Sequence, residues 1–318
     1  MYPQIIDANI NRIAEGLRVI EEYTRFIVQH EIITQQLSVI RKKINLSEKN
    51  PIQNLMIRNV SQDVRAAEVP QKRQDIAHLL KANFKRVEEG LRVLEEYTGE
   101  PLYNQLRYEI YMIEKEIFLY HLKPTIKPGI YLISHDVDIL EQGLKWNVSL
   151  IQLRDKEGNK QDFIQKARYL KELTKAYQTP LIINDHIDVA QLIDADGFHS
   201  GQDDLSVEDQ RLLLGPHKII GKTTHSFEQG LQAKAEGADY VSVGPIWETP
   251  SKPGREGIGF DYLNAATKLK IPYVAIGGIS LESYEKLVHY HPPLIGIVRA
   301  HQDIPELQKL CLAHSRLI

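Results

Sequence analysis

Eight short apolar segments alternate with amphipathic stretches after residue 128, and this alternation constrains the fold more than any other feature of the sequence. The segments are residues 129–134, 148–154, 180–184, 197–199, 218–222, 240–244, 272–276 and 294–298. Strands and helices that alternate at this spacing are typical of βαβ units with right-handed crossovers. Eight such units predict an α/β fold, a (β/α)8 TIM barrel. A doubly wound open sheet is the alternative, because the number of strands alone does not establish closure.

A repeated sequence before residue 100 predicts a helical domain in front of the barrel. Residues 8–24 and 82–98 are identical at 12 of 17 positions. In both copies apolar residues recur at the i, i+3, i+4 and i+7 spacing of one buried helix face. Residues 31–46 and 105–120 show further helical patterns. Residues 1–122 are therefore expected to form an all-helical domain with an internal repeat, a bundle of two related halves.

Each copy of the repeat has a glycine in the middle of its predicted helix, Gly16 in the first and Gly90 in the second. Glycine at such a position costs up to about 1 kcal/mol relative to alanine. A close crossing of two helices explains these glycines better than contact of the backbone with a ligand.

The segment 121–128 separates the two patterns and contains Pro124 and Pro128. Two prolines in a short stretch are typical of a connection between domains. The expected organisation is a helical domain over residues 1–122, followed by a catalytic barrel over residues 129–318.

Composition excludes several classes of function. The chain has 39 Lys+Arg against 42 Asp+Glu, a formal net charge of −3, which does not suit nucleic acid or an anionic membrane surface. Apolar runs stay well below the ~18 residues that span a bilayer, and the first residues lack a basic segment followed by an apolar core. A cytoplasmic location is therefore expected. The single cysteine, Cys311, is expected to be a packed thiol rather than a nucleophile.

The second predicted strand ends in a cluster of cations. In a barrel of this type the functional groups lie at the carboxyl ends of the strands. Period-two alternation places Gln152, Arg154 and Lys156 on one side of that strand end. Two cations and an amide favour a clamp for phosphate or pyrophosphate over a solvated loop with exposed charges.

Carboxylates follow the next two predicted strands. Asp185 comes directly after Asn184 at the end of the third strand, and Asp204 follows the fourth. Mg²⁺ is usually held by one or two carboxylates together with substrate phosphates and water. Taken singly, each aspartate is better explained as a helix cap. Beside the cationic cluster, however, the pair favours a magnesium site.

The remaining strand ends supply a hydroxyl, a long loop and backbone amides. Thr223 directly follows the fifth predicted strand and is expected to contact a ligand. Residues 244–259 form a polar loop that contains Lys252, of the kind that closes over substrates; a surface insertion is the alternative. The loops at 277–280 and 296–300 are expected to bind phosphate through backbone amides.

The order and spacing of these motifs resemble the thiamine phosphate synthase family over residues 129–300. The motifs are residues 152–156, 184–185, 197–204, 221–225, 244–252 and 277–279. Each motif alone is weak, but six in register are specific. The resemblance implies a transferase that joins 4-amino-2-methyl-5-hydroxymethylpyrimidine diphosphate to a thiazole phosphate or thiazole carboxylate phosphate. The products would be thiamine phosphate and pyrophosphate.

The resemblance also implies roles for individual residues. The pyrimidine diphosphate would be held by Gln152, Arg154, Lys156, Asn184, Thr223 and Lys252. The residues implied in catalysis are Arg154, Lys156, Thr223 and Lys252. Asp185 and Asp204 would bind Mg²⁺ as the cofactor. The thiazole phosphate would contact Thr249, Ser251, Gly278, Val298 and Arg299.

Some positions depart from the family pattern. Thr223 stands where the family more often has serine and Ser251 where it has threonine, and both keep the hydroxyl. Arg299 replaces a small serine; it adds charge if the backbone amide binds phosphate, and crowds the site if its side chain turns inward. The helical domain resembles the amino-terminal extension of some longer family members, whose role does not follow from the sequence.

These residues suit a dissociative substitution, in which cations neutralise departing pyrophosphate and little proton transfer is needed. One rival function is a thiazole tautomerase on the same barrel, with His225 as the acid or base. The other is a non-catalytic binding protein. The expected partners are small phosphorylated substrates, without nucleic acid or membrane, and whether the chain forms a homo-oligomer stays open.

Overall fold

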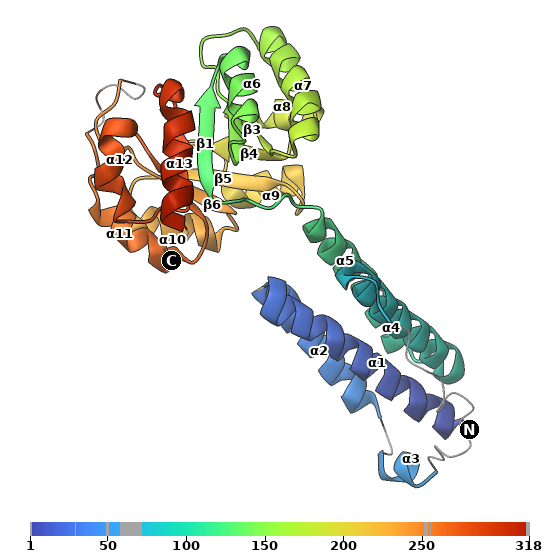
Figure 1. The fold of residues 1–318 in the computed structure, drawn as a ribbon. Coiled ribbons are helices and arrows are strands. Elements are labelled where there is room, and N and C mark those ends of the chain that lie inside the picture. The colour runs from blue at the N-terminus through green and yellow to red at the C-terminus, as the bar shows by residue number, and fades with distance from the viewer. Residues whose placement is uncertain are drawn as a thin grey trace. The chain divides into compact units, whose positions relative to one another are not determined.

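The computed structural model describes residues 2–28, 30–48, 51–57, 72–250, 254 and 256–315. The chain divides into two compact units, Met1–His121 and Leu122–Ile318, and each is described by itself (Figure 1). Among the described residues, no helix has both the length and the apolar character needed to cross a membrane.

The first unit consists of helices and short connections in the residues that the structure describes. Its elements are α1 (Pro3–Tyr23), the π-helical turn η1 (Thr24–Val28), α2 (Glu31–Ser47), α3 (Pro51–Ile57), α4 (Ile76–Thr98) and α5 (Pro101–His121). The Asp75 carboxylate caps α4 by accepting a hydrogen bond from the His78 amide. The helix ends at Gly99, whose φ of +66° is the left-handed conformation that favours glycine. The predicted all-helical region before the barrel is confirmed.

The two copies of the repeat form α1 and α4, which pack against each other through their glycines. A Cβ on Gly16 would lie 2.9 Å from Cγ2 of Val87, and a Cβ on Gly90 would lie 2.7 Å from Cγ1 of Ile13. Ile13 and Val87 are equivalent positions in the repeat, so the contact is reciprocal. The close helix crossing expected from the sequence accounts for both glycines.

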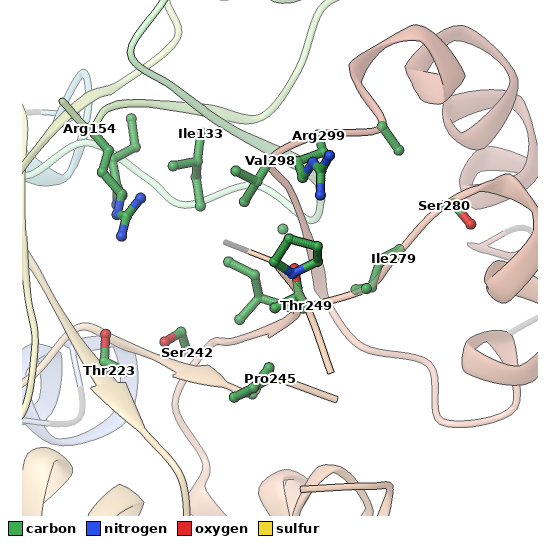
Figure 2. A pocket seen from close by; sticks show the side chains of 18 of the residues that line it. Ile133, Arg154, Thr223, Ser242, Pro245, Thr249, Ile279, Ser280, Val298 and Arg299 are labelled. Carbon is green, nitrogen blue, oxygen red and sulfur yellow. The ribbon is translucent and has the colours of Figure 1, made fainter. Parts of the chain in front are cut away.

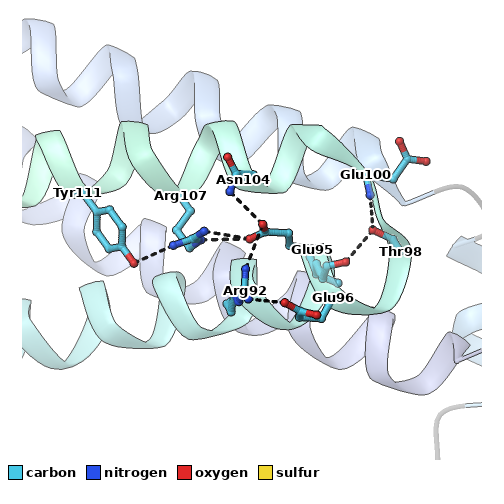
Figure 3. Close-up of polar contacts among 9 residues, drawn as sticks. Arg92, Glu95, Glu96, Thr98, Glu100, Asn104, Arg107 and Tyr111 are labelled. Carbon is cyan, nitrogen blue, oxygen red and sulfur yellow. Dashed lines mark hydrogen bonds and ion pairs between the residues drawn. The ribbon is translucent and has the colours of Figure 1, made fainter.

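A matching glutamate in each copy holds the repeat helix to the helix that follows it. In the first copy, Glu21 of α1 accepts a hydrogen bond from Arg41 Nε of α2 at 2.8 Å. In the second, Glu95 of α4 pairs with Arg107 Nη2 of α5 and with Arg92 Nη1 of its own helix, both at 3.1 Å (Figure 3). The duplicated glutamate thus links each repeat helix to the helix that follows it, around an apolar core made largely of Ile and Leu side chains.

The second unit is a closed barrel of eight parallel strands in sequential order, surrounded by helices. The strands are β1 (Gly129–Ser134), β2 (Leu150–Leu153), β3 (Leu181–Asn184), β4 (Gly197–Ser200), β5 (Ile219–Thr224), β6 (Tyr240–Val243), β7 (Tyr273–Ile276) and β8 (Leu294–Ile297). The helices are α6 (Val137–Lys145), α7 (Lys160–Tyr177), α8 (Ile187–Leu192), α9 (Val207–Leu214), α10 (Phe227–Ala235), α11 (Asp261–Ala266), α12 (Leu281–Val288) and α13 (Ile304–Ser315), with the 3-10 turns η3 (Thr267–Leu269) and η4 (His301–Asp303). The predicted TIM barrel is confirmed. The open-sheet alternative is wrong, since β1 pairs with β8 from Gly129↔Leu294 to Leu132↔Ile297.

Alternation along each strand divides the barrel into two cores. Residues that face outward, such as Leu132, Ile151 and Ile183, are buried against the surrounding helices. Residues that face inward form a separate cluster of Tyr131, Ile133, Leu150, Ile182, Ile219, Tyr240, Val274 and Leu294. This inner cluster fills the barrel below the carboxyl ends of the strands, and the cavity described next lies above it.

Candidate active site

A cavity of about 510 Å³ opens at the carboxyl ends of the strands (Figure 2). Residues from all eight strands or the loops directly after them line it. The predicted site residues among them are Gln152, Arg154, Asn184, Thr223, Thr249, Gly278, Val298 and Arg299. On β2, β3, β5 and β6 the inner face therefore changes from apolar side chains in the inner cluster to polar side chains at the cavity, whereas β1, β7 and β8 stay apolar there.

The end of β2 contributes Gln152 and Arg154 to the cavity. Gln152 is buried, with 2% of its surface exposed, and its carboxamide Nε2 donates to the Tyr131 hydroxyl at 2.6 Å. Within the described part of the chain, Lys156 is not a lining residue, although its Nζ lies 3.7 Å from Asp185 Oδ2. The alternation predicted across 152–156 ends because β2 stops at Leu153.

Asp155 anchors the loop that follows Arg154. Its carboxylate accepts hydrogen bonds from Lys166 Nζ at 3.1 Å and from the amides of Gly158 at 2.9 Å and Glu157 at 3.2 Å. Burial raises the pKa of Asp155, but the bonds from Lys166 and the two amides outweigh it, so the pKa lies below its ordinary value. The loop between β2 and α7 is thus held by a residue that the sequence analysis did not single out.

Asp185 follows β3 with a positive φ of +60°. The N-cap of α8 is His186, so Asp185 does not occupy the capping position that was the alternative to a metal ligand. The Asp185 amide donates to the His199 carbonyl at 3.1 Å, which joins the end of β3 to β4. The Asp185 side chain, paired with Lys156, is one third exposed and accessible to a ligand.

Asp204 lies in the loop between β4 and α9, where its Oδ2 accepts a hydrogen bond from the Gly201 amide at 2.6 Å. Ser206 caps α9 by accepting from the Asp209 amide, so Asp204 is not the helix cap. The loop is fixed from below, because the Leu205 carbonyl accepts from Lys222 Nζ at 3.0 Å. Burial lowers the pKa of Lys222. The exposed Asp204 carboxylate is therefore presented by an anchored loop.

In the ranges that the structure describes, no three His, Cys, Asp or Glu side chains form a group able to hold a metal ion by themselves. The two predicted metal ligands thus provide at most part of a coordination shell. A hard divalent cation that takes its other ligands from substrate phosphate and water is compatible with such a pair.

Three polar lining residues were not predicted from the sequence as ligand contacts: His199, Ser242 and Glu248. His199 is 7% exposed and its Nε2 lies 3.0 Å from the Thr223 hydroxyl oxygen. Thr223 and Ser242 lie close together on neighbouring strands at the cavity wall (Figure 2). The sequence does contain a feature that could have identified His199 and Ser242, because each is a polar residue at an inward position of an apolar run.

The loops after β7 and β8 form another part of the wall. Gly277 has φ +99°, and a Cβ there would lie 2.4 Å from Pro245 Cβ, so the loop requires glycine for both conformation and space. Ser280 caps α12, whose amino-terminal end therefore faces the cavity together with Gly278. Arg299, just after β8, extends its guanidinium into the cavity (Figure 2).

The loop after β6 contributes Glu248, Thr249 and Pro250 to the wall. Ser251 and Lys252 lie outside the described residues. His225 is not a lining residue in the part of the chain that the structure describes. Its ring Nδ1 lies 2.6 Å from the Gly244 carbonyl oxygen. This position does not favour His225 as the acid or base that a tautomerase would need.

Residues 127–300 match the model of the thiamine monophosphate synthase family, which is more than half of the chain. The chain belongs to this family. Residues 4–116 match the model of a second family, the ThiD2 family. The family membership confirms the resemblance stated from the motifs.

Relatives extend the similarity over both units. The thiamine-phosphate synthase of a Synechocystis strain is 37% identical over 314 aligned residues, which cover 93% of this chain and 90% of the relative. The thiamine-phosphate synthase of Thermosynechococcus vestitus is 36% identical, covering 93% of this chain and 89% of the relative. The aligned sequence therefore includes the helical unit as well as the barrel.

A solved structure supports the barrel assignment. The thiamine phosphate pyrophosphorylase of Pyrococcus furiosus superposes with a TM-score of 0.54 at 27% identity, covering 61% of this chain and 98% of that protein. The chain is thus a transferase of the thiamine monophosphate synthase family.

Proposed function

We propose that the barrel joins 4-amino-2-methyl-5-hydroxymethylpyrimidine diphosphate to a thiazole phosphate, and releases thiamine phosphate and pyrophosphate. The observation that carries the proposal is the distribution of charge in the cavity. Arg154 lies toward one side of it and Arg299 toward the other, with apolar side chains such as Ile133 and Val298 between them (Figure 2). A cavity with two cationic sides and an apolar middle suits two anionic substrates whose rings meet at the centre.

The Arg154 side is assigned to the diphosphate. Gln152, Asn184 and Thr223 line the same part of the wall as Arg154, and Lys156 lies beside Asp185 just outside it. Arginine binds phosphate oxygens through two parallel hydrogen bonds, and amide and hydroxyl groups add directed donors. Lys252, on the family pattern, completes this set from the loop after β6.

The donor set beside the diphosphate fits Mg²⁺. Asp185 and Asp204 offer hard carboxylate oxygens from two adjacent loops, and neither is used as a helix cap. When bound, Mg²⁺ neutralises charge on the pyrophosphate and fixes its orientation. Lys156 contributes a further positive charge next to Asp185 and balances that carboxylate.

The Arg299 side is assigned to the thiazole phosphate. Gly278 and Val298 form this wall with the amino-terminal end of α12, where backbone amides favour an anion. Arg299 adds a charge where the family usually has a small residue, and its side chain is turned into the cavity (Figure 2). Thr249 lies on the same wall, and Ser251 follows it in sequence.

The reaction needs electrostatic stabilisation and positioning more than proton transfer. The bond between the pyrimidine methylene carbon and the diphosphate oxygen breaks, and its electron pair leaves with pyrophosphate. Arg154, Lys156 and Lys252 stabilise the charge that develops on the leaving group, and Thr223 donates to it. The apolar side chains at the centre disfavour water there, so the thiazole nitrogen captures the pyrimidine cation and forms the new carbon–nitrogen bond.

The test is to incubate the purified chain with Mg²⁺ and both substrates and to measure thiamine phosphate and pyrophosphate in equal amounts. Product that requires all three components supports the proposal. Binding of both substrates without product would identify a non-catalytic binding protein instead. A proton shift in the thiazole phosphate without Mg²⁺ would identify a tautomerase.

A further inference from the structure

A continuous chain of hydrogen bonds crosses the barrel interior below the cavity. Gln152 Nε2 lies 2.6 Å from the Tyr131 hydroxyl, which lies 2.7 Å from the Tyr240 hydroxyl. The Tyr240 hydroxyl is 2.9 Å from His199 Nδ1, and His199 Nε2 is 3.0 Å from the Thr223 hydroxyl. The chain begins and ends at residues assigned to substrate, while its three central members come from β1, β6 and β4.

The central members are buried. Tyr131 is 1% exposed, Tyr240 0% and His199 7%. A Cβ on Gly221 would lie 2.1 Å from the Tyr240 ring, so the ring occupies the space left by that glycine. Burial raises the pKa of both phenols, so each keeps its single proton at neutral pH.

Each hydroxyl and the neutral imidazole in the chain has one proton to donate. The direction of one hydrogen bond therefore determines the direction of all the others. Because Gln152 donates to Tyr131, the Tyr131 proton is directed to Tyr240. The Tyr240 proton is then directed to His199 Nδ1, so the imidazole carries its own proton on Nε2 and donates to Thr223. The Thr223 hydroxyl accepts that bond, and its own proton remains available to the cavity as a donor.

Turning the Gln152 carboxamide over would reverse every bond. Thr223 would then donate to His199 and offer the cavity only an acceptor. The chain therefore has two arrangements, and each fixes the carboxamide of Gln152 and the hydroxyl of Thr223 together. Only the first arrangement gives Thr223 a proton to donate to an anionic oxygen.

We propose that Tyr131, Tyr240 and His199 are positioning residues that fix, as one unit, the direction in which Gln152 and Thr223 present hydrogen bonds to the substrate. This inference rests on the proposed function, since the two ends are assigned to the pyrimidine diphosphate. The three residues act through Gln152 and Thr223 and supply no reacting group themselves.

The test compares Tyr131→Phe with Tyr273→Phe. Tyr273 is another buried barrel tyrosine, but it faces the outer core and lies outside the chain of bonds. Tyr131→Phe is expected to lower kcat/KM for the pyrimidine diphosphate by about 10- to 100-fold, because misplaced groups lose that much in oriented reactions. The KM for thiazole phosphate should stay within about twofold. Tyr273→Phe should change neither.

Two further measurements separate positioning from a structural role. The double variant Tyr131→Phe with Thr223→Val should be no worse than the worse single variant, because residues of one unit are not additive. His199→Gln, which keeps one donor and one acceptor, should retain more activity than His199→Leu at similar thermal stability. Additive losses, or a Tyr131→Phe enzyme as active as Tyr273→Phe, would overturn the proposal.

A binding assay tests the positioning chain separately from the proposed function. If the wild-type chain makes no thiamine phosphate, calorimetric binding of inorganic pyrophosphate with Mg²⁺ replaces the kinetic assay. Weaker binding by Tyr131→Phe but not by Tyr273→Phe then supports the positioning chain alone. A wild-type chain that binds no pyrophosphate overturns both proposals.

Discussion

Gly90 of α4 lies so close to Ile13 of α1 that a Cβ at residue 90 would lie 2.7 Å from Ile13 Cγ1. Gly90→Ala should therefore destabilise the helical unit. Overpacking costs about 1–3 kcal/mol, more than the roughly 1 kcal/mol that alanine gains over glycine inside a helix. Hydrogen exchange of the α1 and α4 peptides in the full chain should become faster.

Glu89→Ala is the matched control for Gly90→Ala, because residue 89 is the exposed neighbour on the same helix. It should leave exchange unchanged. Adding Ile13→Ala to Gly90→Ala should recover part of the loss, so that the two changes sum to less than their separate costs. Slower exchange in Gly90→Ala would contradict the tight crossing.

Asp185→Asn should abolish most turnover while keeping the fold. Asparagine tolerates the φ of +60° at this position, so the change removes charge without backbone strain. Losing a ligand of the proposed Mg²⁺ should lower kcat by about 100-fold or more, since metal ions supply several kcal/mol of charge stabilisation. Steady-state rates as a function of Mg²⁺ concentration measure this effect.

Asp203→Asn is the control for Asp185→Asn, because Asp203 is an exposed aspartate in the neighbouring loop and has no proposed role. It should retain the wild-type rate and Mg²⁺ dependence. A near-normal rate in Asp185→Asn would rule out the metal role of this residue.

Substitution of each arginine in the cavity should weaken the binding of a different substrate. Arg154→Ala should raise the KM for the pyrimidine diphosphate, and Arg299→Ala the KM for the thiazole phosphate, each by about 10- to 100-fold for the loss of a charged hydrogen bond. The KM for the other substrate should change by less than about threefold in each variant. The opposite pairing would show that the substrates bind the other way round.

Asp155→Asn should destabilise the barrel in a pH-dependent way. The pKa of Asp155 is lower in the folded chain, so its carboxylate contributes stability above the unfolded value of about 4, and this is lost as the pH falls through the folded pKa. At pH 7 the free energy of unfolding, measured in urea, should be about 1–3 kcal/mol lower for the variant than for wild type. The difference in the free energy of unfolding between the variant and wild type should become smaller below about pH 4.

Asp162→Asn is the comparison for Asp155→Asn, since Asp162 also pairs with Lys166 at 3.1 Å but is 49% exposed. An exposed ion pair contributes little to stability, so Asp162→Asn should have nearly the wild-type free energy of unfolding at every pH. If the free energies of unfolding of Asp155→Asn and wild type instead diverge toward low pH, that result would show that the Asp155 carboxylate is not stabilising.

Local sequence pattern predicted much of the fold and several residues of the cavity wall. The first strand was placed at residues 129–134, where β1 lies, because its apolar run is sharply bounded. Gln152 and Arg154 were assigned to one side because alternation along a strand needs no knowledge of its neighbours. Closure of the barrel was not available from the sequence, since the pairing of Gly129 with Leu294 depends on the whole chain.

Side-chain partners on other elements, and the exact end of β2, explain what the sequence pattern did not predict. Tyr131 and Tyr240 were counted as apolar strand residues, yet their hydroxyls meet across 109 positions of sequence. Asp155 received no role because its partner Lys166 lies on the following helix. Lys156 was placed with Arg154 by extending the alternation, but β2 ends before it and the side chain lies at Asp185 instead.

The reciprocal contact between α1 and α4 has a consequence for the origin of the helical unit. Gly16 meets Val87 and Gly90 meets Ile13, and a contact in which each position meets the equivalent of its partner is the mark of isologous twofold symmetry. The unit thus has the internal architecture of a homodimer of helical hairpins joined into one chain. Covalent linkage makes this association independent of protein concentration, so the interface forms however dilute the enzyme is.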